Sequence, residues 1–176
     1  MNQLLEGLKK IVSVLEQEDI NYMIVGGFAM SYFNLARFTA DIDFIVQIHP
    51  IDVEKILKHF PEWENFNDAF KESVQFGRMF NLLDFNTGVK YDFMSYKDSD
   101  YNWTAFERRQ RVDFMGVECY ISSPEDLIIS KLIWYGISKS EKQKTDILHL
   151  LNEVKLDKNY IELWLTRQNI LRYGIL

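Results

Sequence analysis

Cysteine, histidine and proline are scarce in this sequence, which has one, three and three of them among 176 residues. The lone Cys119 cannot build a disulfide framework or a cysteine-ligated zinc site. The three histidines, His49, His59 and His149, are scattered along the chain and do not favour a histidine zinc site. We therefore expect a protein of the reducing cytoplasm.

Long apolar runs and an excess of positive charge are also missing. No 18 consecutive residues are free of charged and strongly polar side chains, so we expect no membrane-spanning helix and no membrane partner. The N-terminal stretch is interrupted by Glu6, Lys9 and Lys10 and lacks a signal-peptide core. Lys and Arg number 20 and Asp and Glu 26, for a net charge of −6, which argues against a protein that coats nucleic acid.

The composition otherwise suits one globular domain. Hydrophobic residues make up 47%, aromatic residues 15% and charged residues 26%, which supplies the apolar side chains for a sizeable core. Periodicity predicts helices over residues 2–18, 28–34, 51–60, 101–110, 123–135, 140–154 and 158–171, and strands over 22–25, 41–48, 79–85, 89–94, 112–114 and 117–121. Residues 61–77 fit neither pattern. We expect an α+β fold with a small mixed sheet flanked by helices: a core over residues 1–122 and a C-terminal helical segment over 123–176, in one compact unit.

Two aspartates, Asp41 and Asp43, alternate with the apolar Ile42 and Phe44 in a predicted strand. Side chains at positions i and i+2 project from the same face of a strand, about 6–7 Å apart. Two acids so close repel each other at neutral pH unless a positive charge lies between them. Carboxylates are hard oxygen ligands that suit Mg²⁺. The pair therefore predicts a divalent-cation site, although an Asp-x-Asp pair alone also occurs by chance.

A diglycine, Gly26-Gly27, lies between the strand over 22–25 and the next predicted helix. Free backbone N–H groups at a helix start attract anions, and glycine lets a phosphate approach the backbone closely. A lone diglycine after a strand is often only a turn. Followed by a carboxylate pair, however, it matches the triphosphate of a nucleotide with its Mg²⁺, and two such ions would clamp the oxygens of an in-line displacement.

The string VGGFAMSYFNLARFTADIDFIV, residues 25–46, resembles the signature of the DNA polymerase β-type nucleotidyltransferase superfamily, which is a hydrophobic residue, two glycines, a gap and Asp-hydrophobic-Asp. It is similar to the small prokaryotic branch that includes abortive-infection toxins of toxin–antitoxin systems. That branch commonly reads Arg-x-Thr-x-Asp-hydrophobic-Asp, as residues 37–43 do here. Segments 123–132 and 144–147 also resemble the branch, so the likeness spans about residues 20–151.

The resemblance implies a nucleotidyltransferase fold. It implies transfer of a nucleoside monophosphate from a nucleoside triphosphate such as ATP to a hydroxyl of an RNA, a protein or a small molecule. It also implies two Mg²⁺ or Mn²⁺ ions, held by Asp41, Asp43 and a third aspartate on a later strand. A cognate antitoxin or a second copy of the chain would be a partner. The alternative is a non-catalytic nucleotide-binding or partner-binding module with the same fold.

Asp92 fits the third aspartate best, because it is an acid inside the apolar strand over 89–94 and a buried acid needs a partner. The resemblance implies that it shares a metal ion and orients or deprotonates the acceptor hydroxyl. Asp113, near a turn, is the alternative for this place. Asp84 lies beside its hairpin turn and is expected to be exposed.

The resemblance also implies nucleotide contacts. Gly26 and Gly27 would hold the β- and γ-phosphates, helped by Ser31 if it lies on the same helix face. Arg37 would contact a phosphate or pair with an acid at the edge of the site. Lys131 would contact the triphosphate or the base, or would extend its charged end to solvent.

Other charged and capping residues give further expectations. Asp146 is predicted to be a structural partner of a basic residue. Ser123 is predicted to cap the helix over 123–135, with Pro124 at its first position. Two short basic runs are typical of solvated faces or would hold a nucleic-acid acceptor: Arg108, Arg109 and Arg111, and Lys139, Lys142 and Lys144.

Overall fold

The computed structural model describes residues 3–35, 39 and 41–176, and within them the chain forms one mixed sheet and a set of helices. The strands are β1 (Tyr22–Val25), β2 (Asp41–Val46), β3 (Phe80–Asp84), β4 (Val89–Ser95), β5 (Gln110–Phe114) and β6 (Val117–Ile121). The α-helices are α1 (Gln3–Gln17), α2 (Gly26–Tyr32), α3 (Val53–Leu57), α4 (Asn67–Gln75), α5 (Asp100–Glu107), α6 (Pro124–Ser138), α7 (Glu141–Glu153) and α8 (Lys158–Arg167). The 3₁₀ helices are η1 (Pro50–Asp52) and η2 (Pro61–Phe66).

The six strands lie in the order β3-β4-β2-β1-β6-β5. β2 pairs with β4 in parallel and with β1 antiparallel, while β1 pairs with β6 in parallel. The β3–β4 and β5–β6 hairpins are antiparallel. The sheet is therefore mixed, and the α+β fold predicted from the sequence is confirmed.

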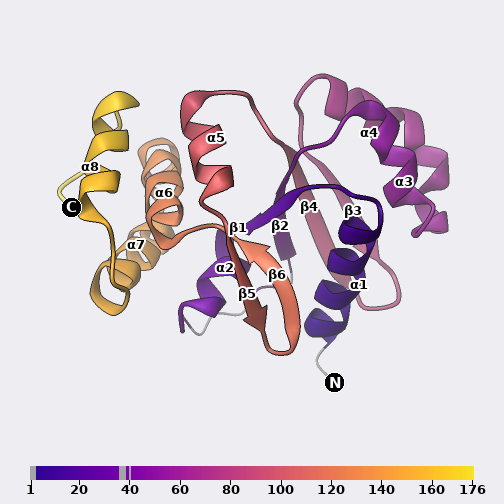
Figure 1. Ribbon diagram of the computed structural model, residues 1–176, viewed down its shortest axis with the longest axis horizontal. Coiled ribbons are helices and arrows are strands. Elements are labelled where there is room, and N and C mark those ends of the chain that lie inside the picture. The colour runs from indigo at the N-terminus through magenta and orange to yellow at the C-terminus, as the bar shows by residue number, and fades with distance from the viewer. Residues whose placement is uncertain (1–2, 36–38, 40) are drawn as a thin grey trace.

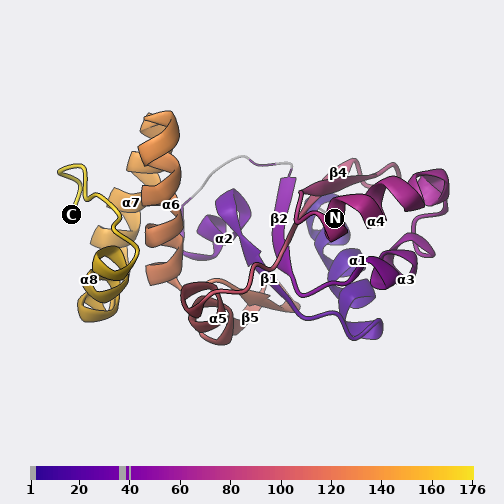
Figure 2. The same ribbon diagram turned by 90° about the horizontal axis from the view of Figure 1, so that it is seen from above.

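Helices lie on both sides of this sheet. Figure 2 shows α1, α3 and α4 on one side, and α2 with α6, α7 and α8 on the other. The face of β2 that carries Ile42 and Phe44 is fully buried. Tyr91, which faces the same way from β4, donates a hydrogen bond from its hydroxyl to the Gly7 carbonyl of α1 at 3.0 Å. The main core therefore lies between the sheet and α1.

The opposite face of β1, β2 and β4 has a much smaller apolar cluster. Met23 and Val25 of β1 pack there with Phe106 of α5, and the partly buried Ile45 and Met94 pack against them. Ile45 and Met94 stand near the ends of β2 and β4. The first halves of these two strands, on the same face, carry the polar residues that form the candidate site.

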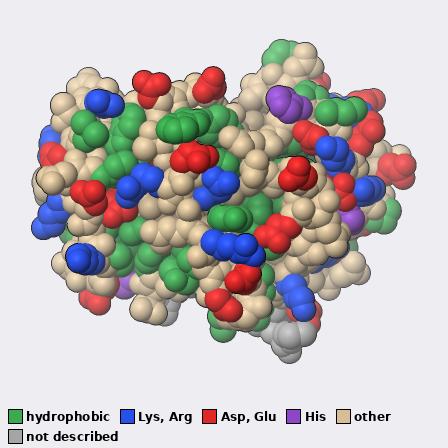
Figure 3. All heavy atoms as spheres, viewed as in Figure 1, with side chains coloured by type: hydrophobic (Ala, Val, Ile, Leu, Met, Phe, Trp, Pro, Cys, Tyr) green, Lys and Arg blue, Asp and Glu red, His purple; other side chains and the backbone are tan. Residues whose placement is uncertain are grey.

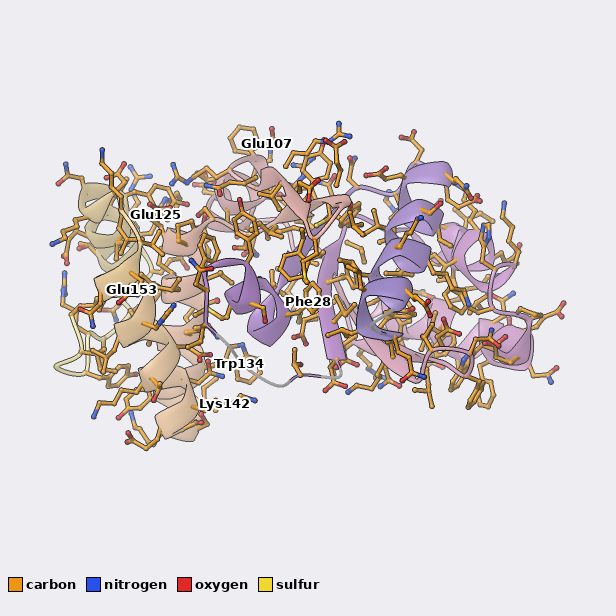
Figure 4. The ribbon with its side chains drawn as sticks, turned by 90° about the horizontal axis from the view of Figure 1, so that it is seen from below. Phe28, Glu107, Glu125, Trp134, Lys142 and Glu153 are labelled. Carbon is orange, nitrogen blue, oxygen red and sulfur yellow. The ribbon has the colours of Figure 1, made fainter. Side chains whose placement is uncertain are left out.

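An ion-pair network centred on Arg108 joins α5 to α6 and α8, helices that lie near one another at one end of the molecule in Figure 1. Arg108, at the end of α5, donates to Glu125 at 3.1 Å, and its Nε lies 3.7 Å from Asp126. Its guanidinium also stacks on the Tyr160 ring of α8, 3.8 Å from the ring centroid. Glu125, labelled in Figure 4, accepts a hydrogen bond from the Asp157 amide at 2.9 Å. One arginine thus connects α5, α6 and α8.

Three expectations about local structure need correction. The helix predicted over 101–110 ends at Glu107, because Gln110 already belongs to β5 and pairs with Ile121. The unassigned segment 61–77 contains η2 and α4. Only Phe70 and Val74 of α4 are buried, which is too few apolar positions to show a helical stripe.

Asp84 is buried, although its place beside a hairpin turn predicted exposure. Its side chain has no accessible surface and lies 3.2 Å from Lys10 Nζ of α1. One carboxylate oxygen accepts from the Asn86 amide at 3.1 Å, and the other from the Tyr91 hydroxyl at 3.5 Å. The expectation was wrong because α1 packs over this end of the hairpin and supplies a cation.

The start of α6 agrees with the sequence analysis. Ser123 caps α6 and Pro124 opens it, as predicted. Among the described residues, no helix combines the length and the apolar character needed to cross a bilayer.

The cap of α6 gives the first testable prediction. Ser123 Oγ accepts a hydrogen bond from the Asp126 amide at 3.2 Å, and Ser123 is buried. Ser123→Ala should lower the free energy of unfolding by about 1–2 kcal/mol, because a buried amide loses its acceptor. Urea denaturation measures this loss.

Ser140 provides a matched control. It is the N-cap of α7, but its side chain makes no capping hydrogen bond. Ser140→Ala should change the free energy of unfolding by less than about 0.5 kcal/mol. Equal losses in the two variants would contradict the role assigned to Ser123.

Candidate active site

The parallel pairing of β2 with β4 brings the predicted aspartates together. Asp43 lies opposite Asp92, and Asp41 lies opposite Lys90. Neighbouring strands are about 4.8 Å apart, and alternate residues share a face. Asp41, Asp43, Lys90 and Asp92 therefore form a two-by-two patch of charged side chains on the side of the sheet away from α1.

Asp113 lies elsewhere. It belongs to β5, which is separated from β2 by β1 and β6. Its exposed side chain accepts a hydrogen bond from the Gly116 amide across its own turn, at 2.7 Å. Asp92, rather than Asp113, is the acid that accompanies the Asp41–Asp43 pair.

The diglycine has a role that the sequence analysis missed. α2 begins at Gly26, two residues before the predicted start at Phe28, and Gly26 has a left-handed φ of +66°. A Cβ atom placed on Gly26 would lie 2.1 Å from Asp43 Oδ2. The Gly27 amide forms a hydrogen bond with Asp43. Glycine is required here because the β1–α2 corner lies directly against the Asp43 carboxylate. Ser31 is half-buried and four residues after Gly27, hence on the same face of α2.

The environment of Asp43 disfavours the ionised form of its side chain. Burial raises the pKa of Asp43 above its ordinary value, and the neighbouring Asp92 and Asp41 raise it further. The hydrogen bond from the Gly27 amide and the charge of Lys90 act in the opposite direction but do not cancel the rise. The site therefore stores unfavourable electrostatic energy at neutral pH.

Lys90 bridges two of the three carboxylates. Its Nζ lies 2.9 Å from Asp92 Oδ2 and 3.6 Å from Asp41 Oδ2. The hydrogen bond to Asp92 raises the pKa of Lys90. The sequence analysis did not single out Lys90. The signal was its position two residues before a buried acid, which places both side chains on one face of the strand.

The patch gathers carboxylate oxygens, the kind of ligand that divalent cations prefer. Asp92 Oδ1 is buried and has no hydrogen-bond partner among the residues that the structure describes. A buried carboxylate oxygen without a partner is costly, and a hard cation would satisfy it. In the present arrangement of the described side chains, no three His, Cys, Asp or Glu residues form a group that could hold a metal ion. The ammonium of Lys90 instead occupies the position between Asp41 and Asp92.

The remaining predicted nucleotide contacts have different outcomes. Lys131 is buried in α6, so it does not extend to solvent, and its Nζ lies 2.7 Å from Asp146 Oδ2 of α7. The prediction that Asp146 is the structural partner of a basic residue is confirmed. Arg37 lies outside the described residues.

The arginines of the first basic run have partners within the protein. Arg108 belongs to the network described above. Arg109 donates to the Phe106 carbonyl at 2.7 Å, and Arg111 donates to Glu118 at 2.6 Å. Figure 3 shows acidic and basic side chains interspersed over one face of the molecule. This pattern is typical of a solvated surface.

A mixed sheet with a carboxylate pair on one strand, a third carboxylate on the parallel neighbour and a diglycine corner beside them is the arrangement that the resemblance to nucleotidyltransferases predicts. The chain belongs to a family of nucleotidyltransferases of unknown function (DUF6036), which it matches over residues 2–173. It is thus a nucleotidyltransferase enzyme by family. No curated protein matches it.

Solved structures support the same fold. An antigenic nucleotidyltransferase-like protein from Paracoccidioides brasiliensis aligns with a TM-score of 0.55 and 17% identity, over 94% of this chain and 87% of that one. ANT(2'')-Ia in complex with adenylyl-2''-tobramycin aligns with a TM-score of 0.57 and 13% identity, over 96% and 98%. The lincomycin-bound lincosamide antibiotic adenylyltransferase LnuA aligns with a TM-score of 0.50 and 12% identity, over 85% and 97%.

The close approach of Gly26 to Asp43 gives a second prediction. Gly26→Ala should destabilise the protein in two ways: a left-handed alanine costs about 1–2 kcal/mol, and the clash with Asp43 adds about 1–3 kcal/mol. Gly88→Ala is the control, because Gly88 also has a left-handed φ, of +70°, but has nothing within 4 Å of the added Cβ. Urea denaturation of both variants separates the two costs, and equal losses would contradict the packing role of Gly26.

The raised pKa of Asp43 gives a third prediction. The native state binds the Asp43 proton more tightly than the unfolded state does, so this group's contribution to stability falls as the pH rises from about 4. Asp43→Asn removes the charge and keeps an oxygen for the Gly27 amide. With a chelator present, the variant should therefore be more stable than the wild type at pH 7, and the gain should shrink as the pH falls towards 4.

Asp113→Asn is the control for this measurement. Asp113 also accepts a backbone amide but lies outside the charged patch, so its substitution should bring no gain at pH 7. Unfolding free energies from urea titrations between pH 4 and 7 check both expectations. An Asp43→Asn variant less stable than the wild type at pH 7 would show that Asp43 is not electrostatically strained.

Proposed function

We propose that this protein is a divalent-cation-dependent enzyme that transfers a nucleoside monophosphate from a nucleoside triphosphate, such as ATP, to an acceptor hydroxyl and releases pyrophosphate. One observation carries the proposal: Asp43 and Asp92 lie opposite each other on parallel strands, Asp41 lies on the same face, and the β1–α2 corner lies against Asp43. Family membership supports the reaction class. Phosphoryl transfer depends chiefly on positioning and on charge stabilisation.

The three aspartates are proposed as ligands of two Mg²⁺ or Mn²⁺ ions. Such ions, when bound, neutralise charge on the triphosphate and on the leaving pyrophosphate. Asp92 is also proposed to orient the acceptor hydroxyl and accept its proton. Its buried Oδ1, which has no hydrogen-bond partner in the described part of the chain, supports a role in binding.

The proposed nucleotide contacts come from both parts of the chain. Gly26 and Gly27 contribute by letting the triphosphate approach the backbone, and Ser31 and Arg37 contribute polar contacts. Lys131 is a further proposed contact, which requires its ammonium to exchange Asp146 for a phosphate. In this proposal the helical segment 123–176 forms the wall of the site opposite the sheet.

A small hydroxyl-bearing molecule is the acceptor that we favour over RNA or protein. The chain aligns with 98% of ANT(2'')-Ia in complex with adenylyl-2''-tobramycin and with 97% of lincomycin-bound LnuA, so a chain of this size has room for a nucleotide and a small acceptor. The partnered arginines of the first basic run give no support to an RNA surface. A cytoplasmic location suits an enzyme that consumes nucleoside triphosphates.

Transfer of labelled nucleotide tests this function. Purified protein is incubated with each α-labelled nucleoside triphosphate, Mg²⁺ or Mn²⁺, and one of three acceptor sets: small aminoglycosides and lincosamides, total RNA, or cell-extract protein. We expect one set to be labelled, and Asp41→Asn to lower the rate at least ~100-fold, since even indirect partners of a metal ligand contribute about 10–100-fold. Asp113→Asn should retain wild-type activity.

The outcomes distinguish the alternatives. Label in RNA or protein would replace the small-molecule acceptor, and would support a toxin that needs an antitoxin partner. Cation-dependent triphosphate binding without transfer to any set would support the non-catalytic binding module. Equal labelling by wild type and Asp41→Asn would remove the aspartates from the mechanism.

A further inference from the structure

Lys90 lies where the carboxylates of the site converge, and the sheet fixes it there. It is the cross-strand partner of Asp41 and lies two residues before Asp92 on the same face of β4. Its side chain is 39% exposed, whereas that of Asp92 is 9% exposed. The ammonium therefore enters the site from solvent and reaches the most buried of the three acids.

The contacts of this ammonium use the oxygens that a cation would need. Lys90 Nζ lies 2.9 Å from Asp92 Oδ2 and 3.6 Å from Asp41 Oδ2. An ammonium carries one positive charge, while the patch carries three carboxylates, and Asp92 Oδ1 has no partner in the described residues. Lys90 thus compensates the acids incompletely. A divalent cation on the same oxygens would meet the positive charge of Lys90 at close range.

We propose that Lys90 is a resident counter-ion: it neutralises Asp41 and Asp92 while no divalent cation is bound, and a cation must displace it from Asp92 Oδ2. The inference rests on the proposed function, because it takes the three aspartates as the cation ligands. Lys90 is then a positioning residue that sets the cation affinity of the empty enzyme. Its effect is to keep that affinity low until a triphosphate brings further oxygen ligands.

The experiment measures Mn²⁺ binding to the full-length, metal-free protein by titration calorimetry, with no nucleotide present. Lys90→Gln should bind Mn²⁺ about five- to tenfold more tightly than the wild type, because displacing a half-exposed ion pair no longer opposes binding. Lys90→Arg keeps the positive charge and should restore wild-type affinity. A role of Lys90 in packing alone would not produce this dependence on charge.

A matched lysine elsewhere controls for the loss of an ion pair. Lys55 is 46% exposed and lies 2.6 Å from Asp52, so Lys55→Gln removes a similar contact outside the site and should leave Mn²⁺ affinity unchanged. Adding Asp92→Asn to Lys90→Gln should abolish the gain, which locates it at the proposed oxygens. Melting temperatures in chelator show that each variant is folded.

Failure of this inference is distinguishable from failure of the proposed function. Mn²⁺ binding that Asp43→Asn abolishes but Lys90→Gln leaves unchanged or weakens would overturn the counter-ion and retain the cation site. Absence of Mn²⁺ binding in both the wild type and Lys90→Gln would overturn the cation site and the counter-ion with it.

Discussion

The parallel register between β2 and β4 is the constraint on which the candidate site depends. It places Asp43 opposite Asp92, across a strand spacing of about 4.8 Å. The strands cannot relax to separate the two acids, because Ile42 and Phe44 on the other face of β2 are fully buried. A slip of one residue would turn the aspartates into the core. Burial of the apolar face thus holds the strands in a register that the repulsion among the carboxylates on the polar face would disfavour.

Two neighbouring features are understood as consequences of this arrangement. Gly26 is a glycine because the β1–α2 corner must pass within van der Waals distance of Asp43. Lys90 supplies positive charge from the row next to the Asp43–Asp92 pair. Neither feature removes the rise in the pKa of Asp43, whose causes are burial and then its two acidic neighbours.

The sequence was informative where one strand or helix decides the outcome. Alternation in β2 predicted which face carries Asp41 and Asp43, and an acid within an apolar strand pointed to Asp92. The role of Lys90 depends instead on which strand β4 pairs with and in which register. The pattern of residues within a single strand does not specify that pairing. Asp84 was misjudged for a similar reason, since the cation beside it, Lys10, lies in α1, far away in the chain.

The hydrogen-bond partners of the buried acids distinguish the structural residues from those of the candidate site. The described buried acids are Asp84, Asp92, Glu125, Asp126 and Asp146. Asp126 shows the structural pattern: burial raises its pKa, yet Ser123 and Tyr160 donate to its two oxygens at 2.6 and 2.8 Å. Asp92 alone in this group has a buried oxygen without a hydrogen-bond partner in the described residues. The fold satisfies its other buried acids but leaves this one incomplete beside two more carboxylates, a pattern expected of a ligand-binding site rather than of a structural acid.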